Sequence, residues 1–229
     1  MHIPDGYLGP VTSIAGYAVM IPLWIIASRQ VKKNLAAKQV PLLAIGAAFS
    51  FVIMMFNIPV PGGTTGHAVG AVLVAILLGP WAATIAVSVA LVIQALLFGD
   101  GGITAIGANC FNMAFILPFT GYAVYRLISS RSHVKSFRRV AAAGIAGYIG
   151  LVIASLVAGI EFGLQPLLHH TTSGQALYCP YGLKVAITSM VAGHALVFGW
   201  VELIVTALVV KFLQVQDPAL LEQQIGVGE

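Results

Sequence analysis

The feature that most constrains the fold is an apolar run from His67 to Phe98, about 32 residues long and interrupted once, at Gly79-Pro80. One helix of that length would be roughly 50 Å long at about 1.5 Å per residue. A bilayer's hydrocarbon core is only about 30 Å thick. We therefore predict two short helices, 67–78 and 81–98, joined by a tight turn.

Further apolar runs of spanning length flank this pair. They cover residues 11–28, 40–56, 109–128, 140–160 and 184–213. With 59% hydrophobic and 8% charged residues, the chain falls outside the range of soluble domains, in which roughly a quarter of residues are charged. We predict an all-α integral membrane protein, a single transmembrane domain over 1–229 with seven transmembrane helices and an N-terminal metal-binding segment, 1–10.

The basic residues set the orientation. If residues 67–98 form a hairpin, only Lys184 falls on one side of the membrane, and the other side carries Arg29, Lys32, Lys33, Lys38, Arg126, Arg131, Lys135, Arg138, Arg139 and Lys211. The positive-inside rule makes that richer side cytoplasmic, so the N-terminus is expected outside and the C-terminus inside. Topology thus explains the net charge of +4 without a nucleic-acid partner.

The first two residues form a potential chelate. The amine of Met1, the amide nitrogen of His2 and its imidazole Nδ1 close two adjacent rings, so three nitrogens lie nearly in one plane. A further imidazole, such as that of His67, would complete a square. Square-planar nitrogen coordination indicates Ni(II) or Cu(II), with Co(II) also open. The alternative is a frayed terminus without a role. The bulky His2 favours retention of Met1. Residues 1–10 also carry no basic region typical of a signal peptide, so we expect this N-terminus to be the mature one.

Other outer residues are candidates for orienting these ligands. Asp100, Thr104 and Asn109 lie in or beside an outer loop and could hold His2 or His67 in place; the alternative is that they are turn and cap residues. We also expect a helix to begin at His67, because Thr64 or Thr65 could cap it. The helix N-terminus would then keep the imidazole neutral.

Four more ionisable side chains are candidates for a functional role. Glu202 and His194 lie within an apolar span, where such groups are functional suspects by default. We expect them to form a structural hydrogen-bonded pair. His169 and His170 are adjacent in a polar loop and resemble a metal pair, but neighbouring loop residues more often point apart.

Several absences exclude enzyme classes. The chain has no phosphate-binding Gly-x4-Gly-Lys-Ser/Thr motif, no His-Glu-x-x-His and no Gly-x-Ser-x-Gly. It is not expected to be an enzyme or to hydrolyse ATP unaided. Its two cysteines, Cys110 and Cys179, are too few for a disulfide framework or a zinc cluster, and we expect them to be buried free thiols.

Three motifs carry a family resemblance. They are Met1-His-Ile-Pro-Asp-Gly-Tyr-Leu8, Pro61-Gly-Gly-Thr-Thr-Gly-His-Ala-Val-Gly70 and Phe98-Gly-Asp-Gly-Gly-Ile-Thr-Ala-Ile-Gly-Ala-Asn-Cys-Phe-Asn-Met113. In this order they closely resemble the substrate-binding component of cobalt/nickel energy-coupling-factor transporters, the CbiM/NikM family. The resemblance implies seven helices, an extracellular N-terminus folded into the protein, and metal ligation by Met1, His2 and His67.

The resemblance also implies partners in a prokaryotic cell membrane. These are a membrane coupling subunit, two cytoplasmic ATPases and often a small two-span companion, which we do not expect to be fused to this chain. Ala44 and Ala48 match the small-residue pattern through which such components contact the coupling subunit. We expect ATP-driven uptake of Ni(II) or Co(II), without an organic cofactor. The alternative is a self-sufficient divalent-metal permease, and the sequence leaves the choice of metal open.

Overall fold

The computed structural model describes residues 1–60 and 64–222. The helices before the central turn are α1 (Pro10–Asn34), the short 3-10 helix η1 (Ala37–Gln39), α2 (Val40–Met54) and α3 (Ala71–Leu78). After it come α4 (Pro80–Ile93), the π-helix η2 (Gln94–Phe98), α5 (Ile106–Cys110), the π-helix η3 (Phe111–Ile116) and α6 (Leu117–Ser129). The last are α7 (Phe137–Gly163), α8 (Gln165–Leu168), α9 (Leu183–Gly193), the π-helix η4 (His194–Phe198), α10 (Gly199–Gln216) and α11 (Ala219–Glu222).

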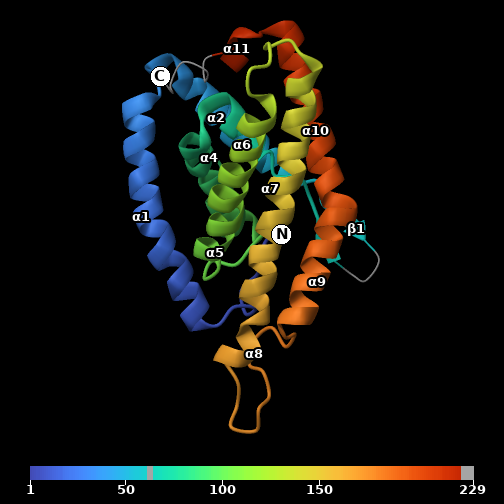
Figure 1. Cartoon of the computed structure of the whole chain (residues 1–229). Helices are drawn as coiled ribbons and strands as arrows, with labels where there is room; N and C mark the ends of the chain where they lie inside the picture. Colours follow the sequence, from blue (N-terminus) through green and yellow to red (C-terminus); the bar gives the residue numbers. More distant parts are fainter. Residues whose placement is uncertain (61–63, 223–229) are drawn as a thin grey trace.

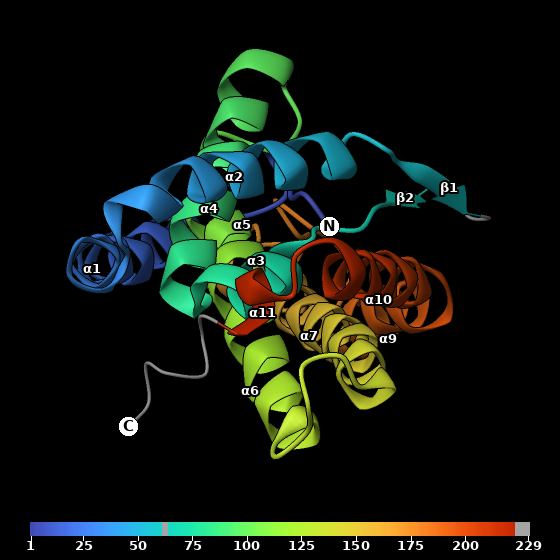
Figure 2. The same ribbon diagram turned by 90° about the horizontal axis from the view of Figure 1, so that it is seen from above.

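The long helices stand side by side as an upright bundle (Figure 1). Seen from above, α1 lies at one edge, α9 and α10 lie at the other, and α3 lies inside (Figure 2). Helix α7 packs against α6, α9 and α10. The glycines of α7 allow this close approach, because a Cβ on Gly150 would lie only 2.8 Å from the carbonyl oxygen of Leu117. Small residues at helix contacts are the usual solution inside a membrane.

The short helix α3 forms the centre of the core. Of its eight residues only Leu77 is not fully buried, and α3 contacts α4, α6, α7 and α10. The expected turn follows directly, at Gly79, whose φ of 88° is a conformation that glycine adopts without strain. Pro80 then occupies the first position of α4, where its missing N–H is not needed.

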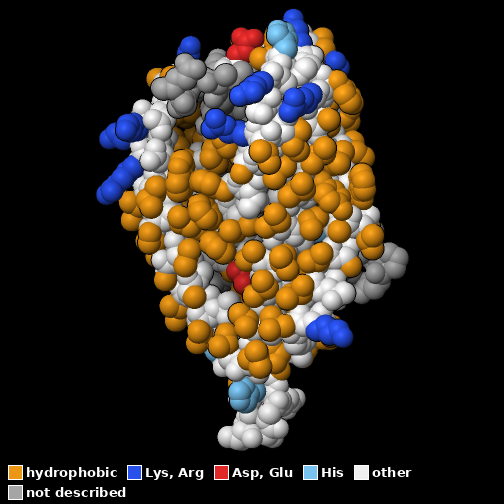
Figure 3. Space-filling view, viewed as in Figure 1, with side chains coloured by type: hydrophobic (Ala, Val, Ile, Leu, Met, Phe, Trp, Pro, Cys, Tyr) orange, Lys and Arg blue, Asp and Glu red, His pale blue; other side chains and the backbone are white. Residues whose placement is uncertain are grey.

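The surface agrees with a membrane protein. Hydrophobic side chains cover the middle of the molecule, and Lys and Arg gather at the end where α11 lies (Figure 3). Five described helices, or runs of consecutive helices, are long and apolar enough to cross a bilayer. They are Pro10–Asn34, Ala37–Met54, Pro80–Phe98, Phe137–Leu168 and Leu183–Gln216. The chain is therefore a helical membrane protein, as its composition predicts.

Two local expectations are wrong. The helix expected at 67–78 begins only at Ala71, because Gly70 has a φ of 72° and the four residues before Ala71 are not helical. The stretch read as a loop at 57–66 contains a two-stranded antiparallel ribbon of β1 (Ile58–Val60) and β2 (Thr64–Gly66), in which Ile58 pairs with Gly66. Thr64 and Thr65 therefore belong to a strand and do not cap a helix.

Candidate metal centre

The N-terminal segment runs into the interior instead of fraying. Met1 is 8% exposed and Ile3 is fully buried. The Asn109 side chain pairs with the backbone of Ile3: Asn109 Oδ1 accepts from the Ile3 N–H at 2.8 Å, and Asn109 Nδ2 donates to the Ile3 carbonyl at 3.0 Å. The N–H of Gly102 donates to the same carbonyl at 2.8 Å. Ile3 therefore joins the loop between η2 and α5 almost as a strand would.

A second clamp acts at Asp5. Its carboxylate accepts from the N–H of Ile103 at 3.0 Å and from the N–H of Thr104 at 2.9 Å, and the Thr104 hydroxyl donates to it as well. These hydrogen bonds, the Thr104 hydroxyl first, lower the pKa of Asp5. Thr104 thus fixes the N-terminal segment through Asp5 and does not contact His2 or His67 directly.

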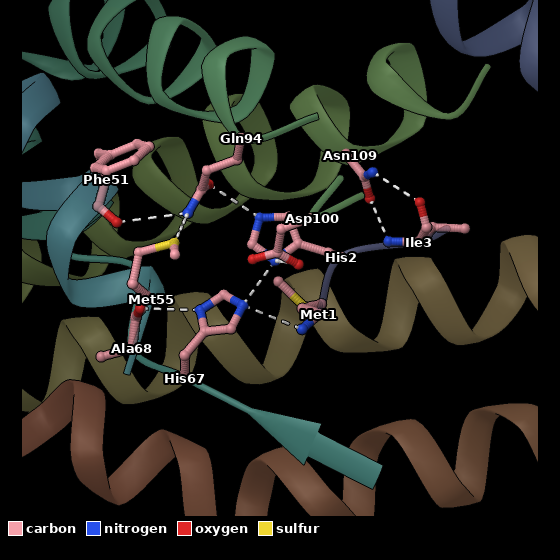
Figure 4. A network of polar contacts seen from close by, with 10 residues as sticks. All are labelled: Met1, His2, Ile3, Phe51, Met55, His67, Ala68, Gln94, Asp100 and Asn109. Carbon is pink, nitrogen blue, oxygen red and sulfur yellow. Dashed lines mark hydrogen bonds and ion pairs between the residues drawn. The ribbon is translucent and has the colours of Figure 1, made fainter. Parts of the chain in front are cut away.

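Three nitrogens converge where this segment ends (Figure 4). The Met1 amine lies 3.4 Å from His67 Nε2, and His67 Nε2 lies 3.0 Å from His2 Nδ1. The two imidazole rings are 4.8 Å apart between centroids. Residues that are 65 positions apart in the sequence thereby face one another in a buried site.

The tautomer of each imidazole follows from the hydrogen bond made by its ring nitrogen that faces away from the other histidine. His67 Nδ1 lies 3.0 Å from the carbonyl oxygen of Ala68, which can only accept, so the proton is on Nδ1. His2 Nε2 lies 3.2 Å from Gln94 Oε1 and carries the second proton. Gln94 is oriented by its own Nε2, which donates to the Phe51 carbonyl. The lone pairs of His67 Nε2 and His2 Nδ1 therefore face each other, an arrangement that a cation between them would stabilise.

Burial keeps the two N-terminal groups uncharged. Desolvation lowers the pKa of the Met1 amine to about 6 and that of His2 to about 3. Both therefore present lone pairs near neutral pH. Among the described residues no cluster of three His, Cys, Asp or Glu side chains could hold a metal. The terminal amine of Met1 and the backbone amide of His2 are further nitrogens beside the two imidazoles.

Asp100 supplies the negative charge beside the three nitrogens. Its Oδ1 lies 3.5 Å from His2 Nδ1. Because that nitrogen carries no proton, the contact is not an ion pair in the neutral site. Desolvation raises the pKa of Asp100, which is partly exposed. A cation at the three nitrogens would be attracted to this carboxylate.

The backbone after His67 is held by a buried carboxylate. Glu202 of α10 is fully buried and accepts from the N–H of Val69 at 2.6 Å and from that of Gly70 at 3.1 Å. The expected Glu202–His194 pair is therefore wrong, because His194 Nδ1 bonds the Met190 carbonyl at 2.8 Å. Glu202 satisfies the free N–H groups that precede α3 and ends the non-helical stretch there.

The residue before His67 is also constrained. A Cβ added to Gly66 would lie 2.4 Å from the ring of Phe198, which belongs to η4. Real Cβ contacts are essentially never that short, so only glycine fits without a shift of the ring or of β2. The end of β2 at Gly66 and η4 thus determine together where His67 enters the site.

The remaining candidates lie apart from this centre. His169 packs its ring against Tyr178, 5.1 Å away between centroids, and His170 forms an isolated bridge with Ala176. Cys110 and Cys179 are buried free thiols, as expected. Ala44 and Ala48 are exposed on the outer surface of α2.

Two residues of the site went unnoticed in the sequence. Gln94 was visible as a polar residue inside an apolar run, and Asp5 as an acidic residue within the N-terminal motif. The sequence alone does not reveal which atoms these two side chains contact. Both contacts join segments more than 90 residues apart.

The chain has close relatives among known proteins. It matches the family CbiM, described as the cobalt uptake substrate-specific transmembrane region, over residues 2–220. It is 53% identical over 221 residues to the fused nickel transport protein NikMN of Rhodobacter capsulatus, with 96% of this chain and 64% of that protein covered. It is 48% identical over 230 residues to a putative metal transport protein of Methanocaldococcus jannaschii, with 99% and 98% covered.

Solved structures agree with this match. The crystal structure of a truncated transition metal transporter superposes with a TM-score of 0.87 at 55% sequence identity. The superposition covers 93% of this chain and 98% of that one. The chain thus spans less than two thirds of the fused relative and nearly the whole of this solved structure.

Proposed function

Because the chain belongs to the CbiM/NikM family of cobalt/nickel transport transmembrane components, we propose that it captures Ni(II) or Co(II) at its N-terminus. The proposed ligands are the amine of Met1, the amide and imidazole of His2, and the imidazole of His67. The ion is the transported substrate and not a resident cofactor. No organic cofactor is part of this proposal.

The separation of the nitrogens is the observation that carries the proposal. In a square of four nitrogens with bonds of about 2 Å, neighbouring donors lie about 2.8 Å apart. The amine, amide and Nδ1 would occupy three consecutive corners, so His67 Nε2 would neighbour both the amine and Nδ1. The corresponding distances are 3.4 Å and 3.0 Å. Small shifts would close this square around an ion.

The donor set limits the choice of ion. A square of nitrogens with a deprotonated amide suits Ni(II) and Cu(II), and Cu(II) binds more tightly by intrinsic order. The relative from Rhodobacter capsulatus is a nickel transport protein. We therefore place nickel first and cobalt second, with metal supply in the cell deciding against copper.

For the membrane arrangement we propose seven crossings within one transmembrane domain. The five long helices supply five crossings, and α3 and the α5–η3–α6 run supply the other two. Helix α3 alone would be only about 12 Å long. The non-helical stretch before it is buried in protein, the condition under which such backbone is tolerated at membrane depth. The basic end would face the cytoplasm and the N-terminus would face outwards.

The partners in this proposal are a membrane coupling subunit, two cytoplasmic ATPases and a small two-span companion. Ala44 and Ala48 are exposed on α2 and would allow a helix of the coupling subunit to approach closely. The fused relative has more than a third of its length outside the match, room for an attached companion.

The test is metal titration of the purified chain beside a variant with two alanines inserted ahead of Met1. The insertion leaves every side chain in place and removes the amine from the five-membered ring that it shares with the His2 amide; a single alanine would not serve, because an amine, two amides and an imidazole can form a square of their own. We expect nickel affinity to fall by at least about a hundredfold, because the amine is no longer adjacent to that amide. The control carries the two alanines after Glu229 and should bind like the native chain.

A second variant, His67→Gln, separates ligand loss from a disturbed N-terminus. It leaves Met1 and His2 intact and should also bind weakly. Undiminished nickel binding by the extended chain would overturn the proposal.

A further inference from the structure

A polar cavity lies at the basic end of the bundle (Figure 3). It holds about 250 Å³ and lies between the end of α6, the start of α7 and α11. Three arginines line it: Arg126, Arg131 and Arg139. Figure 3 shows Lys and Arg side chains gathered at this end. None of these residues has a part in the proposed metal binding.

Arg139 is the fixed element of this cavity. It is only 8% exposed. Its Nε donates to the Ser132 carbonyl at 3.2 Å, and its NH1 donates to the Tyr125 hydroxyl at 3.2 Å. A guanidinium has five N–H donors, so three remain after these two bonds. The Tyr125 hydroxyl accepts from Arg139 and keeps its own proton to donate.

The arginines lack a counter-charge within the part of the chain that the structure describes. No carboxylate of residues 1–60 or 64–222 lies within ion-pair distance of Arg126, Arg131 or Arg139. Leu221 of α11 lines the cavity, and the acidic residue Glu222 follows it directly. Glu222 is exposed and makes no ion pair with these arginines. Of the three only Arg139 is buried, and a buried arginine is almost always paired, because desolvating an unpaired charge is unfavourable.

We infer that this cavity binds a phosphate group, as the headgroup of an anionic phospholipid or as a free phosphate. Arginine forks match phosphate oxygens with two parallel hydrogen bonds. The volume lies below the range typical of drug-sized ligand pockets, which suits a small anion. Basic pockets between transmembrane helices are typical headgroup sites, and anionic lipids are concentrated in the cytoplasmic leaflet. The lipid is therefore the favoured source.

The test measures thermal unfolding of the purified full chain against two probes, phosphatidylglycerol and inorganic phosphate, with phosphatidylcholine as the neutral lipid. A ligand that binds the folded state raises the unfolding temperature with concentration. We expect phosphatidylglycerol to do so and phosphatidylcholine not to. A matching effect of inorganic phosphate would assign the site to free phosphates, and no effect of phosphate would assign it to the lipid. Either result supports a phosphate site.

Arginine variants tie the effect to the cavity. Arg126 is exposed, so the variant Arg126→Gln should fold. It should weaken phosphatidylglycerol binding about tenfold, as expected for the loss of a charge-assisted hydrogen bond. Arg139→Gln should weaken it further. The matched control is Arg138→Gln, because Arg138 is exposed, bonds the Ile128 carbonyl and does not line the cavity. This control should bind like the native chain.

Three outcomes would overturn the inference. The first is binding that Arg126→Gln leaves unchanged, and the second is binding that Arg138→Gln weakens equally, as general surface charge would require. The third is binding of neither probe by the full chain.

Discussion

Replacing Asn109 by leucine removes both side-chain hydrogen bonds that hold the backbone of Ile3 beside the metal centre. Leucine has nearly the shape of asparagine, so the packing around α5 is largely kept. The change therefore acts on the attachment of the N-terminal segment and not on a proposed ligand. We expect the segment to detach more readily and nickel affinity to fall.

The size of the affinity loss follows from the hydrogen bonds that the Ile3 carbonyl and N–H keep in the variant. The Ile3 carbonyl still accepts from the N–H of Gly102, so its loss is small, about 0.5 to 1 kcal/mol. The buried Ile3 N–H has no second acceptor among the described residues and costs about 1 to 3 kcal/mol. A net loss of about 2 kcal/mol corresponds to roughly 30-fold in affinity once the detached form predominates. The expected decrease is therefore up to about 30-fold.

The assay is calorimetric nickel titration of folded protein, with Asn112→Leu as the matched control. Asn112 is equally buried in the same helical run, but its Nδ2 donates to Glu161 of α7 at 2.7 Å. Asn112→Leu should lower thermal stability and leave nickel affinity unchanged. Equal losses of affinity in both variants would refute the reasoning, because the effect would then reflect general destabilisation.

Three further predictions concern the same centre. Gln94→Leu removes the acceptor that keeps the proton on His2 Nε2 and should weaken nickel binding about 10- to 100-fold, whereas Gln94→Glu keeps it; equal titrations would contradict this. Nickel affinity should rise about tenfold per pH unit above neutrality, because binding releases the amide proton. Nickel affinity should depend more steeply on pH below about pH 6, where the Met1 amine is protonated. If the slope of log affinity against pH were the same above and below about pH 6, a buried amine would be contradicted. The docked amine also gives up a proton that the detached amine keeps, so docking should strengthen as pH rises from about 6 to 8.0. Glu202→Leu strands two backbone N–H groups before α3 and should lower stability by about 2 kcal/mol or more, with Glu202→Gln losing less; the reverse order in thermal unfolding would refute this.

Apolar periodicity and glycine placement were enough to predict the helical membrane fold. The long runs predict helices because an uncharged stretch of this length can satisfy its backbone in a bilayer only as a helix. The turn at Gly79-Pro80 followed from the length of the run it divides. The convergence of Met1, His2 and His67 was expected from donor chemistry and from the family resemblance, and the metal itself stays a prediction.

The misreadings came from long-range contacts. The start of α3 was placed too early because the carboxylate of Glu202, more than 130 residues away, satisfies the N–H groups of Val69 and Gly70. The same contact separates Glu202 from His194. Gln94 was missed because a lone glutamine in an apolar run has no local signal for its partner. Local propensity could not reveal any of these contacts.

The π-helical segments place a limit on how such a chain can diverge. A π-turn holds one more residue than an α-turn, so it behaves as a single-residue insertion in a helix. Removing one residue from 95–98 would restore regular winding and leave the end of the helix at nearly the same angular position. A deletion in the regular part of α4 would instead rotate everything after it by about 100° and direct Asp100 away from the three nitrogens. Descendants of this sequence can thus lose a codon along η2 more readily than along α4.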